Sequence, residues 1–559
     1  MRRIQRRFFA FCVILCLILT ACAPKQPQAE GSFGQMKYAR PDVDGIHTLL
    51  DSAMERADAG DETVLELYEQ LMDRLLEFDD SYSLATIHNY LDLSDSYYED
   101  EVAWLDEQYT ALDNRMLALT GRILDSPCAS AAREAWGEEF VARYQINAQL
   151  NAPEIEALTV QEQQLVSQYN KLSIQEDGRE QLNEDYMEGE ITLKEYITRY
   201  TEISKQRNRE LGEIYVQLVR LRVQIAQTLG FSRYAGYAYQ SLFRDFTPEE
   251  AADFSQAVQE HLVPLYQALQ ERYMLRILGA EEELEATWED GIPALRSTLP
   301  NGFPEKMLEA LDFMEERQLY DFGGGEKKGQ MAFTTSISGA GSPFLFINTA
   351  VYQDPSTIFH EFGHYYNFYL SQPARWNDGN NLDIAEVHSQ GLELLMHEAY
   401  EQLYGEDADL MRLSNLMDLL YSVLSGCAED HFQQWVFNHP DAALEEMNEA
   451  HAALDAQFGM YEMYYEWVEI PHHFETPFYY ISYATSAISA LELWEIAQGD
   501  RERALSVYDQ ITQFTNNAQY REPLKQCGLS DPFDSDCVEE IAGVLASYAE
   551  VDLELLQAA

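Results

Sequence analysis

The residues best suited to catalysis lie in the short stretch Ser356-Thr357-Ile358-Phe359-His360-Glu361-Phe362-Gly363-His364, which contains the pattern H-E-x-x-H. On an α-helix, residues four apart lie on one face, so His360 and His364 can direct both imidazoles at one zinc ion. Glu361 then lies beside the open coordination position, where its carboxylate can accept a proton from the attacking water. The stretch predicts a zinc-dependent hydrolase with Glu361 as general base. The alternative is two unrelated histidines on a helix surface.

A catalytic zinc ion needs a third protein ligand, and the best candidate is Glu386 in Asp383-Ile384-Ala385-Glu386-Val387-His388-Ser389-Gln390. The intervening segment contains Pro373 and Gly379, which favour a loop, so we expect the second helix to return against the first. Asp383 and Glu393 share the helix face of Glu386. Each could orient a ligand histidine or be an ordinary surface carboxylate. We therefore expect one zinc ion per chain, with three protein ligands: His360, His364 and Glu386.

The elements that must position these residues follow from the pattern of apolar residues. From about residue 45 to 243 the pattern is helical almost throughout, as in 213–229, which ends before Gly230. A new helix start follows at Thr247-Pro248-Glu249-Glu250, with Thr247 as N-cap and Pro248 at the first helical position. We therefore place a boundary near residue 245, between a helical N-terminal lobe (45–245) and a catalytic domain (246–559).

One segment breaks the helical pattern. Between the Gly323-Gly324-Gly325 run and Pro355 the chain is rich in Gly, Thr, Ser and Phe, including Phe344-Leu345-Phe346-Ile347-Asn348. Short β-prone runs bounded by glycines predict a small, antiparallel sheet. It comes directly before the H-E-x-x-H stretch, and helical patterns resume beyond Ser356. The sequence thus predicts a mainly α fold with a small antiparallel β-sheet next to the zinc helix.

The N-terminus predicts export. Four arginines within residues 2–7 precede an apolar run over 8–19, which is shorter than the roughly 20 residues that span a bilayer as a helix. An uncleaved signal anchor is the alternative. The run ends in Leu19-Thr20-Ala21-Cys22, which resembles a bacterial lipobox and implies a signal peptide over 1–22 and a lipid on Cys22. Residues 23–44 would form a flexible tether, and the protein would be lipid-anchored to a membrane outside the cytoplasm.

The chain is acidic and lacks a compact basic patch. It has 96 Asp plus Glu against 37 Lys plus Arg, a formal net charge of −59, so nucleic-acid binding is not expected. The acidity aids solubility or attracts cationic peptides. Among the seven cysteines, Cys128 and Cys427 stand in helical segments and are expected to be buried. Cys527 and Cys537 flank a turn-rich segment, and their pairing as a disulfide is left open.

Several motifs resemble the thimet oligopeptidase and oligoendopeptidase F family. H-E-F-G-H followed by I-A-E-V-H-S is the strongest of them. Upstream, P-F-L-F-I-N-T at 343–349 is similar to the strand that leads into the zinc helix of that family. Downstream, H-H-F-E-T-P-F-Y-Y-I-S-Y at 472–483 is similar to its His/Tyr motif. With Leu229-Gly230-Phe231 and Arg244-Asp245-Phe246-Thr247, the resemblance covers about residues 215–540 in the right order.

The resemblance implies two helical lobes that flank a deep substrate channel, and endopeptidase action on short unstructured peptides. The strand would bind the substrate main chain by strand addition, with Phe344, Phe346 and Asn348 as substrate-binding residues. His472, Tyr480 and Tyr483 would face the scissile carbonyl and donate to the developing oxyanion. With 35 tyrosines in the chain, either tyrosine could instead belong to a core. The choice between His472 and His473 stays open.

Two other classes of function remain as alternatives. A binding lipoprotein on the same fold would capture peptides or zinc without efficient turnover, although the ligand and base positions are all intact here. A zinc peptidase of the thermolysin type would carry its Glu ligand in a different motif. One departure from the family pattern is Asn367, where many members carry a further histidine; it is not a metal ligand, so the chemistry should survive.

Overall fold

The computed structural model describes residues 31–552, apart from 174, 176, 283, 285, 338, 371–381 and 515–517. The predicted signal peptide, Cys22 with its predicted lipid, the first part of the predicted tether and the segment with Pro373 and Gly379 lie outside the described residues. Among the residues that are described, no helix is both long and apolar enough to cross a bilayer.

The chain forms two compact units that interleave along the sequence. The first comprises Met1–Met116, Thr287–Asp378 and Thr512–Thr515, and the second comprises Leu117–Ala286, Gly379–Ile511 and Asn516–Ala559. In the first unit the elements are η1 (Phe33–Gln35), α2 (Val43–Ala59), α3 (Val64–Leu91), the first part of α4 (Ser96–Leu124), α12 (Trp288–Thr298), α13 (Glu305–Arg317), β1 (Tyr320–Asp321), β2 (Ala332–Ile337), β3 (Ser342–Ile347) and α14 (Thr357–Leu370).

The first unit contains the predicted sheet, with strand order β1-β3-β2. Strands β2 and β3 pair antiparallel, with Thr334 opposite Leu345, so the predicted antiparallel sheet is correct for these two strands and wrong for β1. The short β1 pairs parallel to β3, so the three-stranded sheet is mixed. Every residue of β3 is buried, as expected for a central strand. Phe344 and Phe346 pack in a core with Leu84 and Ile87 of α3.

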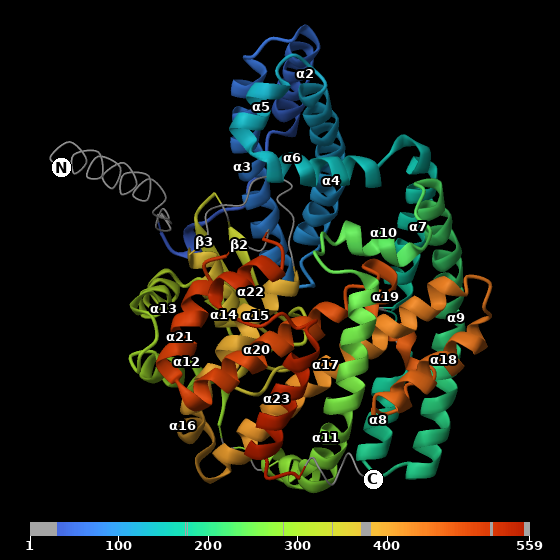
Figure 1. Cartoon of the computed structure of the whole chain (residues 1–559), viewed down its shortest axis with the longest axis vertical. Helices are drawn as coiled ribbons and strands as arrows, with labels where there is room; N and C mark the ends of the chain where they lie inside the picture. The colour runs from blue at the N-terminus through green and yellow to red at the C-terminus, as the bar shows by residue number, and fades with distance from the viewer. Residues whose placement is uncertain are drawn as a thin grey trace, which may run out of the picture. The chain divides into compact units, whose positions relative to one another are not determined.

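Helix α14 packs against β2 and β3 (Figure 1). Its start is fixed by neighbours in the same unit: the Asp354 carboxylate accepts from the backbone N–H of Ser356 at 2.7 Å. Gly291 of α12 allows a close approach here, because a Cβ at that position would lie 2.5 Å from Cδ1 of Ile358 and 2.9 Å from the Pro355 carbonyl oxygen. The zinc helix is therefore held between the sheet and α12.

The second unit is helical in the part that the structure describes. Its elements are the rest of α4, α5 (Ala129–Trp136), α6 (Glu138–Leu150), η2 (Pro153–Ile155), α7 (Glu156–Ser173), α8 (Arg179–Met187), α9 (Leu193–Thr228), α10 (Tyr234–Ser241), α11 (Pro248–Glu282), α15 (Leu382–Leu395), η3 (Met396–Ala399), α16 (Tyr400–Tyr404), η4 (Gly405–Asp407), α17 (Ala408–Asn438), α18 (Leu444–Gln457), η5 (Glu466–Glu469), α19 (Pro471–Glu475), α20 (Ile481–Gly499), α21 (Arg501–Ile511), α22 (Arg521–Cys527) and α23 (Ser535–Tyr548).

Helices α15, α17 and α20 form the centre of this unit, with α20 packed against both of the others (Figure 1). Small residues let these helices approach closely. A Cβ on Gly426 of α17 would lie 2.8 Å from the Cβ of Ala484 and 3.0 Å from the carbonyl oxygen of Tyr480. The backbone of the His/Tyr motif at Tyr480 therefore lies in close contact with α17.

The predicted helix end before Gly230 and the predicted helix start at Thr247 are confirmed. Helix α9 ends at Thr228, and Gly230 follows with φ of 86°. Thr247 and Glu250 form the predicted reciprocal cap: the Glu250 carboxylate accepts from the N–H of Thr247 at 2.8 Å, and the Thr247 hydroxyl accepts from the N–H of Glu250 at 3.2 Å.

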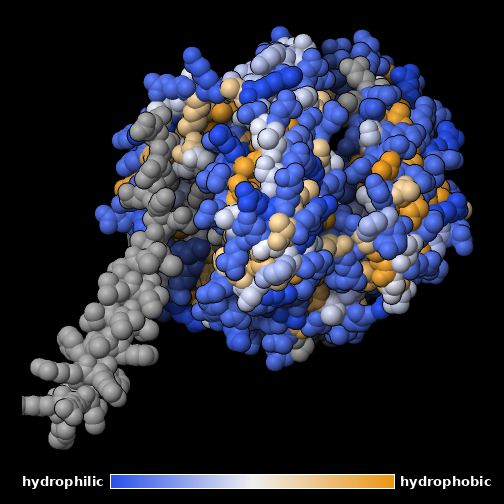
Figure 2. Space-filling view, turned by 90° about the horizontal axis from the view of Figure 1, so that it is seen from above, coloured by the Kyte–Doolittle hydropathy of each residue, from blue (hydrophilic) through white to orange (hydrophobic). Residues whose placement is uncertain are grey.

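The four cysteines of the described chain are all buried and free. Burial of Cys128 and Cys427 agrees with the sequence, and Cys527 and Cys537 form no disulfide in this structure. The face of the molecule in Figure 2 is mostly hydrophilic, with scattered apolar residues, as the composition predicts. The predicted mainly α fold with a small sheet beside the zinc helix is confirmed.

Candidate active site

The predicted zinc helix forms as expected. His360 and His364 lie on α14 with their ring centroids 5.1 Å apart and the ring planes at 78°. Both imidazoles are half-buried, while Glu361 between them is 5% exposed. Two neighbouring imidazoles that can bind the metal, with a sheltered carboxylate between them that can act as general base, are the pattern that zinc hydrolases carry on one helix.

Glu361 is held by a residue that the sequence did not single out. The hydroxyl of Thr334, on β2, donates to Oε2 of Glu361 at 2.7 Å. The hydroxyl oxygen Oγ1 of Thr334 also lies 3.0 Å from the backbone carbonyl oxygen of Glu361. Because one hydroxyl has one proton to donate, the shorter contact to the carboxylate is the stronger. Thr334 therefore fixes the orientation of the predicted base. Thr334 lies in the Gly- and Thr-rich segment before the motif, but nothing in its local pattern distinguishes it.

Asn367, which follows the motif by three residues, ties the helix to a distant part of its own unit. Its side-chain amide donates to the carbonyl oxygens of Thr512 at 2.8 Å and Phe514 at 3.0 Å. The side chain is 2% exposed. Asn367 thus anchors the zinc helix, which agrees with the expectation that it is not a metal ligand.

The structure does not place the predicted substrate-binding side chains where a substrate could reach them. Phe344 and Phe346 are fully buried in the core against α3, because β3 is buried along its whole length. Asn348 is also fully buried, and its amide group bonds to the backbone at Gly325, Gly329 and Ala350. Since β3 is central in the sheet, β1 and β2 are the edge strands in the part of the chain that the structure describes, and β2, with six residues against two, is the longer one.

The predicted zinc ligands are divided between the two units, with His360 and His364 in the first and Glu386 in the second. Glu386 lies on α15 and is half-buried. The hydroxyl of Ser389, one turn further along, donates to Oε2 of Glu386 at 3.0 Å. His388 is fully buried, and its carbonyl oxygen accepts from Tyr508 at 2.8 Å, as expected for a structural residue. Helix α15 thus presents Glu386 as a carboxylate whose orientation is already fixed.

Asp383 and Glu393 have partners within the second unit. Oδ2 of Asp383 pairs with Nε of Arg244 at 3.4 Å, and Oε2 of Glu393 accepts from Asn415 at 3.0 Å. Asp383 is 1% exposed, so its charge is sheltered and paired. These contacts attach both ends of α15 to the rest of the unit.

Arg244 connects α15 to the His/Tyr motif. Besides Asp383, its guanidinium donates to the Ser482 hydroxyl at 2.9 Å, and the group lies over the rings of Tyr239 and Phe246 at 4.6 and 5.2 Å. A buried arginine fork between two elements fixes their relative position. The sequence marked Arg244 only as part of a family-like pattern, because its partners lie 139 and 238 residues away.

The aromatic residues of the His/Tyr motif form one cluster in the second unit. The imidazole of His472 stacks on the ring of Tyr479, with centroids 4.9 Å apart and planes at 8°. Tyr480 and Tyr483 lie edge-on to the same imidazole at 5.2 and 6.0 Å. Thus the structure brings His472, Tyr480 and Tyr483 together as predicted neighbours, and His473 points elsewhere, at Glu429.

Tyr479 is a residue that sequence reasoning missed. It is 7% exposed, and burial is the main reason that its pKa is raised, followed by the neighbouring Tyr483 and Glu386. The influence of Glu386 shows that this cluster lies near the carboxylate of α15 within the same unit. The run of tyrosines at 479, 480 and 483 was the available signal.

The protonation state of His472 follows from its surroundings. Burial, and to a lesser degree the neighbouring His473, lower the pKa of His472 to about 4. At neutral pH the imidazole is therefore uncharged and can donate one hydrogen bond. Burial likewise raises the pKa of Tyr480, so its phenol keeps its proton and is a donor.

The backbone before the tyrosines is strained. Phe478 has φ of 66°, which a bulky L-residue rarely adopts. Its N–H donates to Oε1 of Gln433 at 2.7 Å, and its ring is fully buried against Phe437 and Tyr239. These contacts maintain a turn that directs Tyr479 and Tyr480 toward His472.

Solved structures show which fold this is. The chain is similar to PZ peptidase A in a structure with an inhibitor, with TM-score 0.78 and 23% identity over 94% of this chain and 100% of that chain. It is also similar to a protein assigned as an oligoendopeptidase F, with TM-score 0.76 and 24% identity over 95% of this chain and 100% of that one. A Bacillus anthracis protein with the same assignment matches with TM-score 0.75 and 23% identity over 94% and 99%.

The chain therefore has the fold of the M3 peptidases. Residues 33–151 also match the family model Peptidase M3 N-terminal domain. The match covers the N-terminal part of the chain, and it and the shared fold agree with the resemblance that the motifs carry. Among curated proteins, no sequence matches the chain.

Proposed function

We propose that the chain is a zinc-dependent oligoendopeptidase that hydrolyses internal bonds of short, unstructured peptides outside the cytoplasm. The observation that carries the proposal is α14, where His360 and His364 lie side by side and Glu361 is held by Thr334. Binding a peptide or a metal without turnover does not require a buried, oriented carboxylate between two imidazoles, whereas activating a water molecule does. Peptide cleavage by the purified chain, dependent on zinc, tests the proposal.

The residues fit zinc by their chemistry. We propose that His360, His364 and Glu386 hold one ion, since two imidazoles and a carboxylate are a common ligand set of catalytic zinc sites. When bound, zinc would polarise the scissile carbonyl and make water more acidic. Ser389 would orient Glu386, and Asp383 or Glu393 would support the ligand histidines, as the sequence suggested.

Protein groups supply the proton transfers. Glu361 accepts the proton of the attacking water and delivers it to the leaving amine, so the carboxylate ends the cycle ionised. His472 and the tyrosines Tyr480 and Tyr483 donate hydrogen bonds to the oxyanion that forms on the carbonyl carbon. The lowered pKa of His472 supports this role, because a neutral imidazole donates without adding a charge.

The peptide would bind by strand addition to β2. Its edge position supports this, and Thr334 on the same strand contacts the proposed base. The fully buried Phe344, Phe346 and Asn348 would then stabilise the sheet from within the core and make no contact with substrate.

Flexible peptides of about 5–20 residues are expected to be cut, and folded proteins to stay intact, because an extended backbone is needed for strand addition. The measurement compares one folded protein with its own unfolded short fragments, with products identified by mass spectrometry. Internal cuts in the folded protein at the rate seen for the fragments would contradict this substrate class.

We further propose that the mature chain begins at Cys22 and is anchored to a bacterial membrane by lipid. The basic residues, short apolar run and Leu-Thr-Ala-Cys support this. Wild type is expected to fractionate with membranes and to carry lipid, whereas Cys22→Ser is expected to carry none. Lipid on the Cys22→Ser protein, or wild type that keeps residues 1–21, would contradict the anchor.

A further inference from the structure

The residues from Tyr465 to Glu475, which we call the His472 segment, carry a candidate catalytic histidine on very short elements. The segment consists of η5 (Glu466–Glu469) and α19 (Pro471–Glu475). Helices of four or five residues cannot fix their own position by internal hydrogen bonds. The position of His472 must therefore come from contacts with other elements of the same unit.

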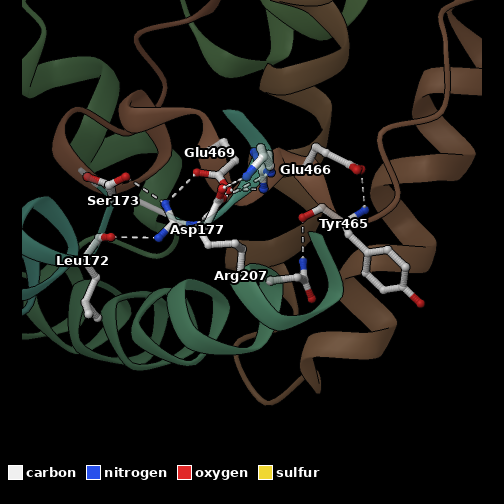
Figure 3. Close-up of polar contacts among 9 residues, drawn as sticks. Leu172, Ser173, Asp177, Arg207, Tyr465, Glu466 and Glu469 are labelled. Carbon is white, nitrogen blue, oxygen red and sulfur yellow. Dashed lines mark hydrogen bonds and ion pairs between the residues drawn. The ribbon is translucent and has the colours of Figure 1, made fainter. Parts of the chain in front are cut away.

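Arg207 of α9 holds the start of the segment. Figure 3 shows its guanidinium directed at Glu469 and at the carbonyl oxygens of Leu172 and Ser173, which end α7. The two contacts to the Glu469 carboxylate are both 3.1 Å, and the two to the carbonyls are both 2.8 Å. Arg207 is 6% exposed, whereas the side chain of Glu469 is 26% exposed, so the guanidinium is buried and the carboxylate is partly open to water. One side chain thus joins α7, α9 and η5.

Arg222, further along α9, holds the part that follows His472. Its guanidinium donates to the carbonyl oxygen of His473 at 3.0 Å and to that of Phe474, while Nε donates to Glu162 at 2.6 Å. Arg222 is 1% exposed. The carbonyl oxygens of His473 and Phe474 thus both accept from one planar guanidinium, an arrangement that the ammonium group of a lysine could not reproduce.

The opposite side of α19 is held by α17. Oε2 of Glu429 accepts from Nε2 of His473 at 2.8 Å, and Oε1 of Glu429 lies 3.0 Å from Nε2 of His451. Nδ1 of His451 lies 3.1 Å from Oδ2 of Asp455. All four side chains are at most 2% exposed. The network reaches His473, the residue next to His472.

The composition of this network, Glu429, His451 and Asp455, would also suit a metal ion. The geometry argues for a different cation. The His451 ring lies between the two carboxylates, and each of its nitrogens faces one of them. Burial would lower the pKa of His451, but Glu429 and Asp455 raise it to about 10. An imidazolium has no lone pair for a metal, so His451 itself supplies a positive charge beside the two buried carboxylates.

We propose that Arg222 and Glu429 are positioning residues that hold His472 in place from two sides. The proposal rests on the peptidase function proposed above. Arg222 fixes the backbone just after His472, and Glu429 fixes the side chain of His473. Neither touches the reacting atoms, so both act through His472.

The main test is Arg222→Lys, which keeps the charge and removes the fork. We expect kcat to fall about 10- to 100-fold with little change in KM, since a small misplacement of a catalytic group acts on the transition state. Arg220→Lys is the matched control, because Arg220 is exposed on the same helix and donates to the carbonyl oxygen of Pro440, outside the His472 segment. Its kcat should equal that of wild type.

A double-mutant cycle separates positioning from a general structural effect. In a His472→Ala background, Arg222→Lys should cost no further activity, because its effect passes through His472. If the two losses multiply, Arg222 supports the fold in general and the proposal is wrong. Glu429→Gln is tested in the same cycle, and a folded variant of either kind with wild-type kcat also overturns the proposal.

A readout without activity tests whether Arg222 holds the His472 segment, separately from whether the chain is a peptidase. Backbone amides of residues 470–476 should exchange faster with deuterium in Arg222→Lys than in wild type, with no such change in Arg220→Lys. Unchanged exchange contradicts the proposal. If wild type cleaves no peptide, the proposed function fails, and exchange alone then decides whether Arg222 holds the segment.

Discussion

Glu361→Gln is expected to bind zinc as wild type does and to lose turnover by about 10²- to 10⁴-fold. An amide has nearly the shape of a carboxylate, and it can still accept the hydrogen bond from Thr334 through its oxygen. It cannot accept a proton from the attacking water. The loss should therefore appear in kcat, with KM little changed.

Zinc content, kcat and KM on one short peptide check this expectation. Glu316→Gln is the control. The substitution makes the same chemical change as Glu361→Gln, and Glu316 is an exposed residue on α13 in the same unit. Near wild-type cleavage by the Glu361→Gln protein would assign the base to another group. Loss of zinc from it would mean that Glu361 belongs to the ligand set.

His360→Ala is expected to remove zinc and with it peptide cleavage. One imidazole of the proposed set is lost, and the remaining ligands bind the ion too weakly to retain it through dialysis. Metal analysis should give about one zinc per wild-type chain and close to none for the variant. The half-buried position of His360 means that the fold should tolerate the smaller side chain.

His439→Ala is the control for this variant. His439 is exposed at the end of α17, where its ring stacks on Trp435, and it is not among the proposed ligands. This variant should keep both zinc and activity. A full complement of zinc in His360→Ala would exclude the proposed ligand set.

The sequence predicted what depends on local spacing. The H-E-x-x-H stretch forms one helix, α14, because its pattern needs only helical geometry to bring His360 beside His364. The start at Thr247 was predicted for the same reason, since its cap partner is three residues away. The sheet before the zinc helix followed from short β-prone runs, although the two-residue β1 carries no such pattern.

What the sequence did not predict depends on contacts between distant residues. Thr334 meets Glu361 across 27 residues, and Arg222 meets the carbonyl of His473 across 251. The partners of such residues exist only once the chain has folded. Phe344 and Phe346 illustrate another limit: the family resemblance implied that they bind substrate, but β3 is the central strand of the sheet and is buried along its whole length.

The interleaving of the two units has a consequence for how the chain folds during synthesis. The core of the first unit joins Leu84 and Ile87 to Phe344 and Phe346, and the hydroxyl of Ser83 donates to a carbonyl oxygen 253 residues later. At about 5–20 residues per second, a ribosome needs roughly 13–50 s to make that intervening stretch. During this time the apolar face of α3 has been synthesised, but the strand that covers it, β3, has not. Closure of such a long loop makes completion of this core a late event in folding, and the apolar face of α3 stays exposed to aggregation until β3 has been made.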